Sequence, residues 1–272
     1  RGVLQAVAAA WYTEAVIFLW LTPLSLACAC YLAAKLVGRA LPSYEAAPLA
    51  FWMLIVVGTW SAGRHLVGGP VPAWIPTMAV FSFSMLLYHF AVVGLNLRPV
   101  FGLSGSVGSA LKFGVGSYLL YGAVAFLACF RGIALRTQFT HFASATEQLF
   151  LYGSVSMILF AALYFLVPQL LGRGWSSPAL MSGHLAGATI GVVLSVVALG
   201  WAGISQGAVM LEPKTGFGEI ASGVRPYLLV NTGAQLVLLA ANLLLAVNFL
   251  RSLCSCCQGS GVSTALSEGS AS

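Results

Sequence analysis

Long runs of apolar residues with almost no charge dominate this sequence and restrict what it can fold into. Of its 272 residues, 60% are hydrophobic and only 7% are charged. Because a helix that spans a bilayer needs about 20 apolar residues, the runs predict seven spans, near residues 8–36, 47–68, 73–96, 109–130, 144–171, 178–208 and 226–250. Backbone groups in lipid must bond within their own segment, which favours helices. We therefore expect an all-α, polytopic transmembrane helical bundle.

The connections between these runs are short, which predicts one transmembrane helical domain over residues 1–250 and no separate soluble module. Residues 251–272 end in the Gly/Ser-rich stretch "QGSGVSTALSEGSAS". Such a composition is typical of a flexible tail.

The net charge of +6 does not indicate nucleic-acid binding, because the cations lie in loops between the runs and form no cluster. They divide between two membrane faces. One face carries Lys35, Arg39, Arg98, Lys112, Arg173 and Arg251, and the other carries Arg1, Arg131, Arg136, Lys214 and Arg225. The positive-inside rule then predicts an inner-membrane protein whose C-terminus is cytoplasmic.

The six cysteines form no disulfide framework. Cys28, Cys30 and Cys129 lie inside predicted spans, where cysteine behaves as a small apolar residue. The remaining three, Cys254, Cys256 and Cys257, follow the last span. Lipidation and metal binding are both conceivable there, but the chain has no second ligand cluster, and we predict neither.

Four polar residues inside the runs predict a shared site. Glu14 lies near the start of the first span, Arg64 and His65 near the end of the second, and Glu147 near the start of the fifth. With alternating directions these positions share one membrane face, where an acid and a cation can pair. The alternative is that each side chain separately reaches the headgroups. His89 stands alone in its span, and we expect it to be a hydrogen-bonded packing residue.

Several stretches together resemble subunit I of the haem-copper oxidases, specifically the cbb3-type cytochrome c oxidase, with the nitric oxide reductases as relatives. They are "GTWSAGRHLVGGPVPAW" (58–74), "LVPQLLGR" (166–173), "GHLAGATIG" (183–191), "WAGISQGAVM" (201–210) and "RPYLLVNTGAQLVLLAANLLLAVN" (225–248). The resemblance covers the last seven of the family's twelve core helices. It implies a respiratory-chain setting, and the family's activity is that of a terminal oxidase, which transfers electrons from cytochrome c to oxygen.

The positions that carry haem and copper ligands in the family hold other residues here. Its haem-ligand histidine pair falls on Thr146 and Gln148, and its copper-binding pair on Arg64 and His65. The third copper histidine falls on Thr13, or on Ala10 under a nitric oxide reductase-like alignment. The tyrosine that the family places before the copper pair falls on Gly58. Because copper needs several imidazoles and haem an axial ligand, the resemblance implies a degenerate metal site.

Three functions remain open at the level of the sequence. The first is a non-catalytic, oxidase-derived subunit that scaffolds a larger respiratory complex. It would have no catalytic residues and no metal, would pair Arg64 with Glu14 or Glu147, and could hold lipid or quinone. Its partners would be other membrane subunits, including cytochrome subunits, and the lipid bilayer. The second is a haem-binding redox subunit completed by another chain. The third, a channel or transporter, is disfavoured because no internal repeat is visible.

Overall fold

The computed structural model of the chain describes residues 2–212 and 214–268, with side chains through Cys254. Every regular element in these residues is a helix. In chain order they are α1 (Gly2–Ala15), η1 (Val16–Leu21), α2 (Thr22–Val37), α3 (Ala47–Gly58), η2 (Thr59–Leu66), α4 (Trp74–Leu97), η3 (Arg98–Gly102), α5 (Gly105–Cys129), α6 (Arg131–Thr137), α7 (His141–Gln148), η4 (Leu149–Ser156), α8 (Met157–Leu171), α9 (Pro178–Met210) and α10 (Phe217–Glu268).

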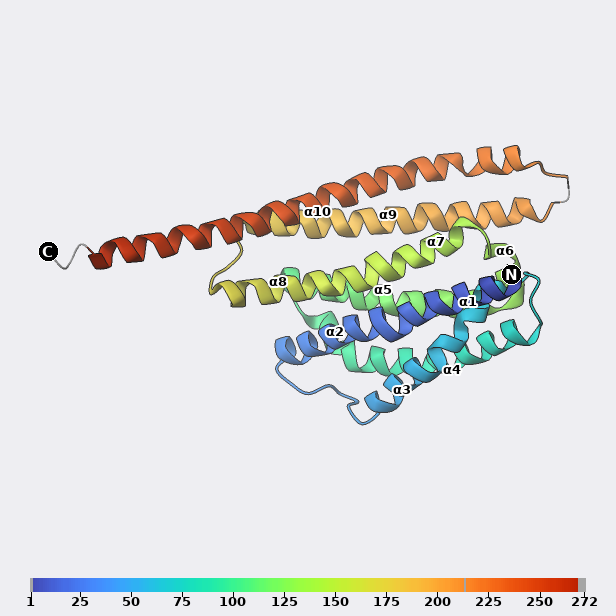
Figure 1. Ribbon diagram of the computed structural model, residues 1–272, viewed down its shortest axis with the longest axis horizontal. Helices are drawn as coiled ribbons and strands as arrows, with labels where there is room; N and C mark the ends of the chain where they lie inside the picture. Colours follow the sequence, from blue (N-terminus) through green and yellow to red (C-terminus); the bar gives the residue numbers. More distant parts are fainter. Residues whose placement is uncertain (1, 213, 269–272) are drawn as a thin grey trace.

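The long helical segments lie side by side and run in alternating directions (Figure 1). Six segments of the described chain are long and apolar enough to cross a membrane. They are Gly2–Val37, Trp74–Gly102, Gly105–Cys129, His141–Leu171, Pro178–Met210 and Phe217–Cys254. The prediction of an all-α, multi-pass membrane protein is confirmed.

The second expected span, residues 47–68, differs from the other six. It consists of the α-helix α3, which ends at Gly58, and the 3₁₀-helix η2, which continues to Leu66. A 3₁₀-helix rises about 2.0 Å per residue against 1.5 Å in an α-helix, so the two together extend about 34 Å. That length matches the hydrocarbon core of a bilayer, about 30 Å thick. This segment is not among the six that are long and apolar enough to cross a membrane, because α3 has only 12 residues, so the seventh crossing stays a prediction.

Two further segments depart from α-helical geometry. The first span contains the π-helix η1 directly after α1, and the fifth contains the π-helix η4 directly after α7. A π-helical turn has a wider ring than an α-helical one and is common near functional sites. Both segments lie within a few residues of the positions that the resemblance singles out.

An aromatic core lies between η1, α4, α5 and η4. Its largest fully buried side chains include Phe18, Phe83, Tyr118, Tyr121 and Phe150. The Tyr121 and Phe150 rings are 4.8 Å apart, and the Phe90 and Tyr118 rings 5.1 Å apart. Aromatic pairs at such spacings pack favourably. They fix the position of the Tyr121 ring.

Helices α9 and α10 form a long hairpin on one side of the bundle (Figure 1). Asn248, within α10, bonds the residue that caps the start of α9, because its Oδ1 accepts from Ser177 N (3.0 Å) and its Nδ2 donates to Ser177 O (2.9 Å). Helix α10 begins at Phe217, earlier than the predicted residue 226, and Pro226 lies inside it.

The same helix α10 continues to Glu268. The flexibility of residues 251–272 and their cytoplasmic placement stay predictions. Cys254 is exposed and forms no disulfide within the described residues. Cys256 and Cys257 lie outside the residues whose side chains are described, and the role of the three-cysteine cluster stays untested.

Candidate functional site

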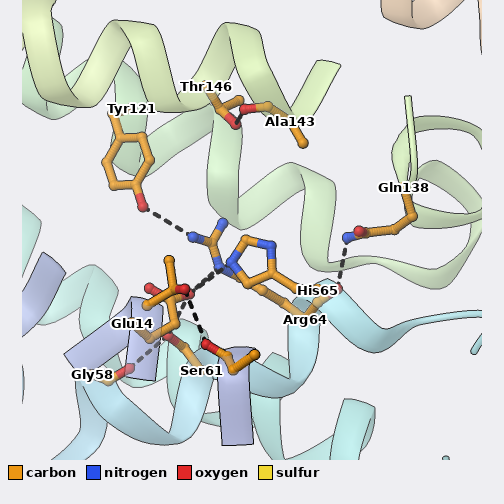
Figure 2. Close-up of polar contacts among 11 residues, drawn as sticks. Glu14, Gly58, Ser61, Arg64, His65, Tyr121, Gln138, Ala143 and Thr146 are labelled. Atoms are coloured by element: carbon orange, nitrogen blue, oxygen red, sulfur yellow. Dashed lines mark hydrogen bonds and ion pairs between the residues drawn. The ribbon is translucent and has the colours of Figure 1, made fainter. Parts of the chain in front are cut away.

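A buried ion cluster joins the first two expected spans. The carboxylate of Glu14, on α1, is fully buried, and its Oε1 accepts from Arg64 Nε at 2.6 Å. The same oxygen lies 3.1 Å from His65 Nε2. Ser61 Oγ donates to Gly58 O at 2.6 Å and lies 3.4 Å from Glu14 Oε1 (Figure 2). One carboxylate oxygen therefore lies within hydrogen-bond distance of side-chain nitrogens of both Arg64 and His65.

Contacts from other helices fix the guanidinium of Arg64. Its Nη2 donates to the hydroxyl of Tyr121 on α5, at 3.0 Å. Its central carbon lies 5.3 Å from the Phe83 ring centroid, within reach of a cation–π interaction. Gln138, which follows α6, donates from Nε2 to the backbone carbonyl of Arg64 at 2.6 Å (Figure 2). Hydrogen bonds thus fix both the side chain and the backbone carbonyl of Arg64.

The local sequence explains why η2 can present these side chains. A Cβ on Gly63 would lie 2.6 Å from the carbonyl oxygen of Ile75, so only glycine allows η2 to lie this close to the start of α4. A Cβ on Gly58 would lie 3.0 Å from the Phe18 ring. The two glycines let η2 press against α4 and η1, which places Arg64 and His65 in the interior.

The structure brings most of the sequence-predicted positions to one cavity of about 280 Å³. The cavity is lined by Tyr12, Thr13, Val16, Ile17, Leu21, Arg64, His65, Tyr121, Thr146, Glu147, Phe150 and Leu151. Gln148 is not among the lining residues. Glu147 is exposed, and in the described part of the chain it joins neither ion pair, so Arg64 is paired with Glu14 alone of the two acids.

The hydroxyl groups of the two threonines that line this cavity donate hydrogen bonds to backbone carbonyls of their own helices. Thr13 Oγ1 donates to Ala9 O at 3.0 Å, and Thr146 Oγ1 donates to Ala143 O at 2.8 Å. Neither hydroxyl is therefore oriented by the opposite wall, and neither is a good ligand for a soft or borderline metal.

The residues present at these positions do not fit haem and copper. His65 is the one imidazole among the five positions that the resemblance assigns to metal ligands, and its Nε2 faces Glu14. Within the described residues, no group of three or more His, Cys, Asp or Glu is placed to hold a metal ion. Arg64 also puts a permanent positive charge in this space, which repels a metal cation.

The other histidines are used elsewhere. His89 is buried, with Nδ1 donating to Ala50 O at 2.9 Å and Nε2 accepting from the Tyr118 hydroxyl at 2.8 Å. The expectation of a hydrogen-bonded packing residue agrees with these contacts. His184 is buried on α9, where Nδ1 bonds the hydroxyl of Tyr164.

Sequence reasoning missed three members of the ion cluster: Ser61, Tyr121 and Gln138. Each is an ordinary residue in its local context, and Tyr121 belongs to a span rich in aromatic and small residues. The only available signal was that a buried arginine needs several acceptors, which predicts that partners exist without saying which.

Comparison with known proteins places this helical bundle among the oxidases. The family model described as Cytochrome C and Quinol oxidase polypeptide I matches residues 1–237, and the chain belongs to this family.

The chain is 27% identical over 262 residues to a cytochrome c oxidase subunit 1 homolog of Agrobacterium tumefaciens (strain T37), covering 91% of this chain and 48% of the relative. It is 30% identical over 220 residues to the cytochrome c oxidase subunit 1 of Rhodobacter capsulatus, covering 78% and 41%. It is 29% identical over 215 residues to a cbb3-type cytochrome c oxidase subunit CcoN1 of Stutzerimonas stutzeri, covering 76% and 45%. The chain thus spans about half the length of the curated relatives it matches.

Proposed function

We propose that this chain is a non-catalytic, oxidase-derived membrane subunit that has lost its metal sites and scaffolds a larger respiratory complex of the inner membrane. One observation carries the proposal. Where the family resemblance assigns metal ligands, the chain has a buried ion pair of Glu14 and Arg64, which His65, Tyr121 and Ser61 contact.

Electrostatics support this replacement. A site that loses its metals loses positive charge from a cavity with polar walls, and the guanidinium of Arg64 supplies a positive charge there. A lone ion inside a membrane protein is costly, whereas a hydrogen-bonded pair costs far less. Both Glu14 and Arg64 are buried and bonded to each other, as a substitute for metal ligation requires.

The scaffolding role rests on the surface and on the relatives. Large apolar side chains are exposed along α1, η1 and α10, including Leu4, Trp20, Leu229, Leu236 and Leu250. Such faces suit lipid and the helices of other membrane subunits. Relatives of about twice this length are named as subunits of cytochrome c oxidase. The partners we propose are other membrane subunits of a respiratory complex, including cytochrome subunits.

The alternative, a haem-binding redox subunit completed by another chain, depends on His65. Its side chain is 29% exposed and lines the cavity, so it is the residue through which this chain could bind a metal.

The test is to purify the native complex carrying His65→Ala and to measure haem by its pyridine haemochrome spectrum and copper by mass spectrometry. His141→Ala, at a partly buried histidine outside the cavity, is the matched control. The proposal predicts equal haem and copper per complex in both variants and the wild type. Loss of haem or copper in His65→Ala alone would overturn it.

A further inference from the structure

The cavity beside the ion cluster is open to a ligand. Its polar wall comes from η2 and α7, and its apolar wall from Val16, Ile17 and Leu21 on η1 and from Phe150 and Leu151 on η4. Figure 2 shows Arg64 and His65 between Glu14 on one side and Tyr121 and Thr146 on the other. One half of the cavity is therefore polar and the other is apolar.

Some polar atoms of this wall make no hydrogen bond to other side chains in the described part of the chain. Arg64 is buried, with 7% of its surface exposed, and its hydrogen bonds to other residues use Nε and Nη2. That leaves Nη1 as a donor next to the cavity. His65 uses Nε2 and keeps Nδ1, and the carboxylate of Glu147 can only accept. The wall thus offers a ligand the Nη1 donor of Arg64 and two acceptors, His65 Nδ1 and the Glu147 carboxylate.

The charges favour a neutral head. The cation of Arg64 is already offset by Glu14 at 2.6 Å, while Glu147 adds a negative charge to the lining. An anionic group such as a phosphate would therefore face Glu147 without a free cation to compensate. In a neutral group, a carbonyl oxygen matches the free donor of Arg64, and a hydroxyl group matches the acceptors of His65 and Glu147.

The size and the opening indicate a ligand that is only partly enclosed. At about 280 Å³ the cavity lies just below the range of about 300–1,000 Å³ that encloses a drug-sized molecule. Tyr12 and Leu151, which line the cavity, are 68% and 44% exposed on the outer surface of the bundle. A head group fits inside, and an attached chain would leave between α1 and η4 into the bilayer.

We propose that this cavity binds the head of a neutral membrane amphiphile whose carbonyl and hydroxyl oxygens bond Arg64, His65 and Glu147. The proposal rests on the proposed function, because a haem in the same space would exclude such a ligand. Diacylglycerols carry both groups, whereas isoprenoid quinones carry the carbonyls in the oxidised form and the hydroxyls in the quinol form.

The test is photolabelling of the native complex in phosphatidylcholine nanodiscs with two probes, an azide-bearing isoprenoid quinone and an azide-bearing diacylglycerol. The labelled peptides are mapped in the wild type and in Leu151→Trp, which fills the opening. The matched control is Leu166→Trp, because Leu166 belongs to the same span, is 42% exposed and does not line the cavity. The haem content of each sample is measured in parallel.

We expect labelling of the peptides around Tyr12 and Leu151, lost in Leu151→Trp and kept in Leu166→Trp. Labelling by the quinone alone or by the diacylglycerol alone identifies the source of the head. No labelling at these peptides, or labelling unchanged by Leu151→Trp, overturns the ligand proposal while leaving the proposed function intact. Haem that disappears in His65→Ala overturns the proposed function itself.

Discussion

Glu14 and Arg64 illustrate how two costly residues become tolerable together. They are 50 positions apart in the sequence, and their side chains meet at 2.6 Å in the interior of the bundle. Burying either ion alone costs several kcal/mol, and their mutual attraction offsets that cost only when the remaining donors and acceptors are also bonded. Tyr121 provides one such hydrogen-bond partner for Arg64, and His65 provides one for Glu14.

Replacing Arg64 by leucine should therefore destabilise the protein strongly. Arg64→Leu leaves the carboxylate of Glu14 buried without its cation, which costs about 3–5 kcal/mol when a buried pair is broken in this way. The measurement is the thermal unfolding midpoint and the free energy of unfolding of the purified protein in detergent.

Two variants make this prediction specific. Glu14→Gln combined with Arg64→Leu removes both charges and should recover most of the lost stability. Arg225→Leu, at an exposed arginine on α10, should change it little. An unfolding midpoint for Arg64→Leu as high as that of Arg225→Leu would contradict the pairing.

At the scale of elements, glycines on α9 decide how closely that helix approaches its neighbours. A Cβ on Gly207 would overlap the carbonyl of Arg136 at the end of α6, whereas a Cβ on Gly200 would meet only Ala145 Cβ, at 3.9 Å. Small residues allow such close approach between membrane helices. The position of α6 matters for the site, because Gln138 follows it directly and bonds the backbone of Arg64.

Adding a methyl group at Gly207 should push α9 away from α6. Gly207→Ala is expected to cost at least about 1–3 kcal/mol, as overpacking generally does, because the overlapping atom belongs to the backbone and cannot rotate away. Gly200→Ala, on the same helix, should be close to neutral. Both are measured as free energies of unfolding in the same detergent, and equal stability of the two variants would refute the close packing of α9 on α6.

At the scale of the whole molecule, hydropathy predicted most of the architecture and missed the local geometry. Apolar runs follow directly from the length of a bilayer crossing, so the six long spans could be located from the sequence. The 3₁₀-helix η2 could not, because its geometry depends on Gly63 packing against Ile75, a tertiary contact.

The candidate site shows the same limit. The sequence predicted that Glu14, Arg64 and Glu147 lie at one depth, because alternating spans fix depth. Depth does not fix the direction in which a side chain leaves its helix, since successive residues are rotated by 100° about the axis. Glu14 therefore points inward to Arg64, whereas Glu147 is exposed at the cavity rim, and no sequence pattern distinguished them.

The most direct test of the central claim, that an ion cluster has replaced the metal sites, is a density map of the native complex around His65, Thr146 and Gln148. We expect side-chain density joining Arg64 to Glu14 and, in the cavity, density of lipid or another amphiphile. A flat macrocycle or a metal peak coordinated by His65 would contradict it, and the chain would then be a redox subunit.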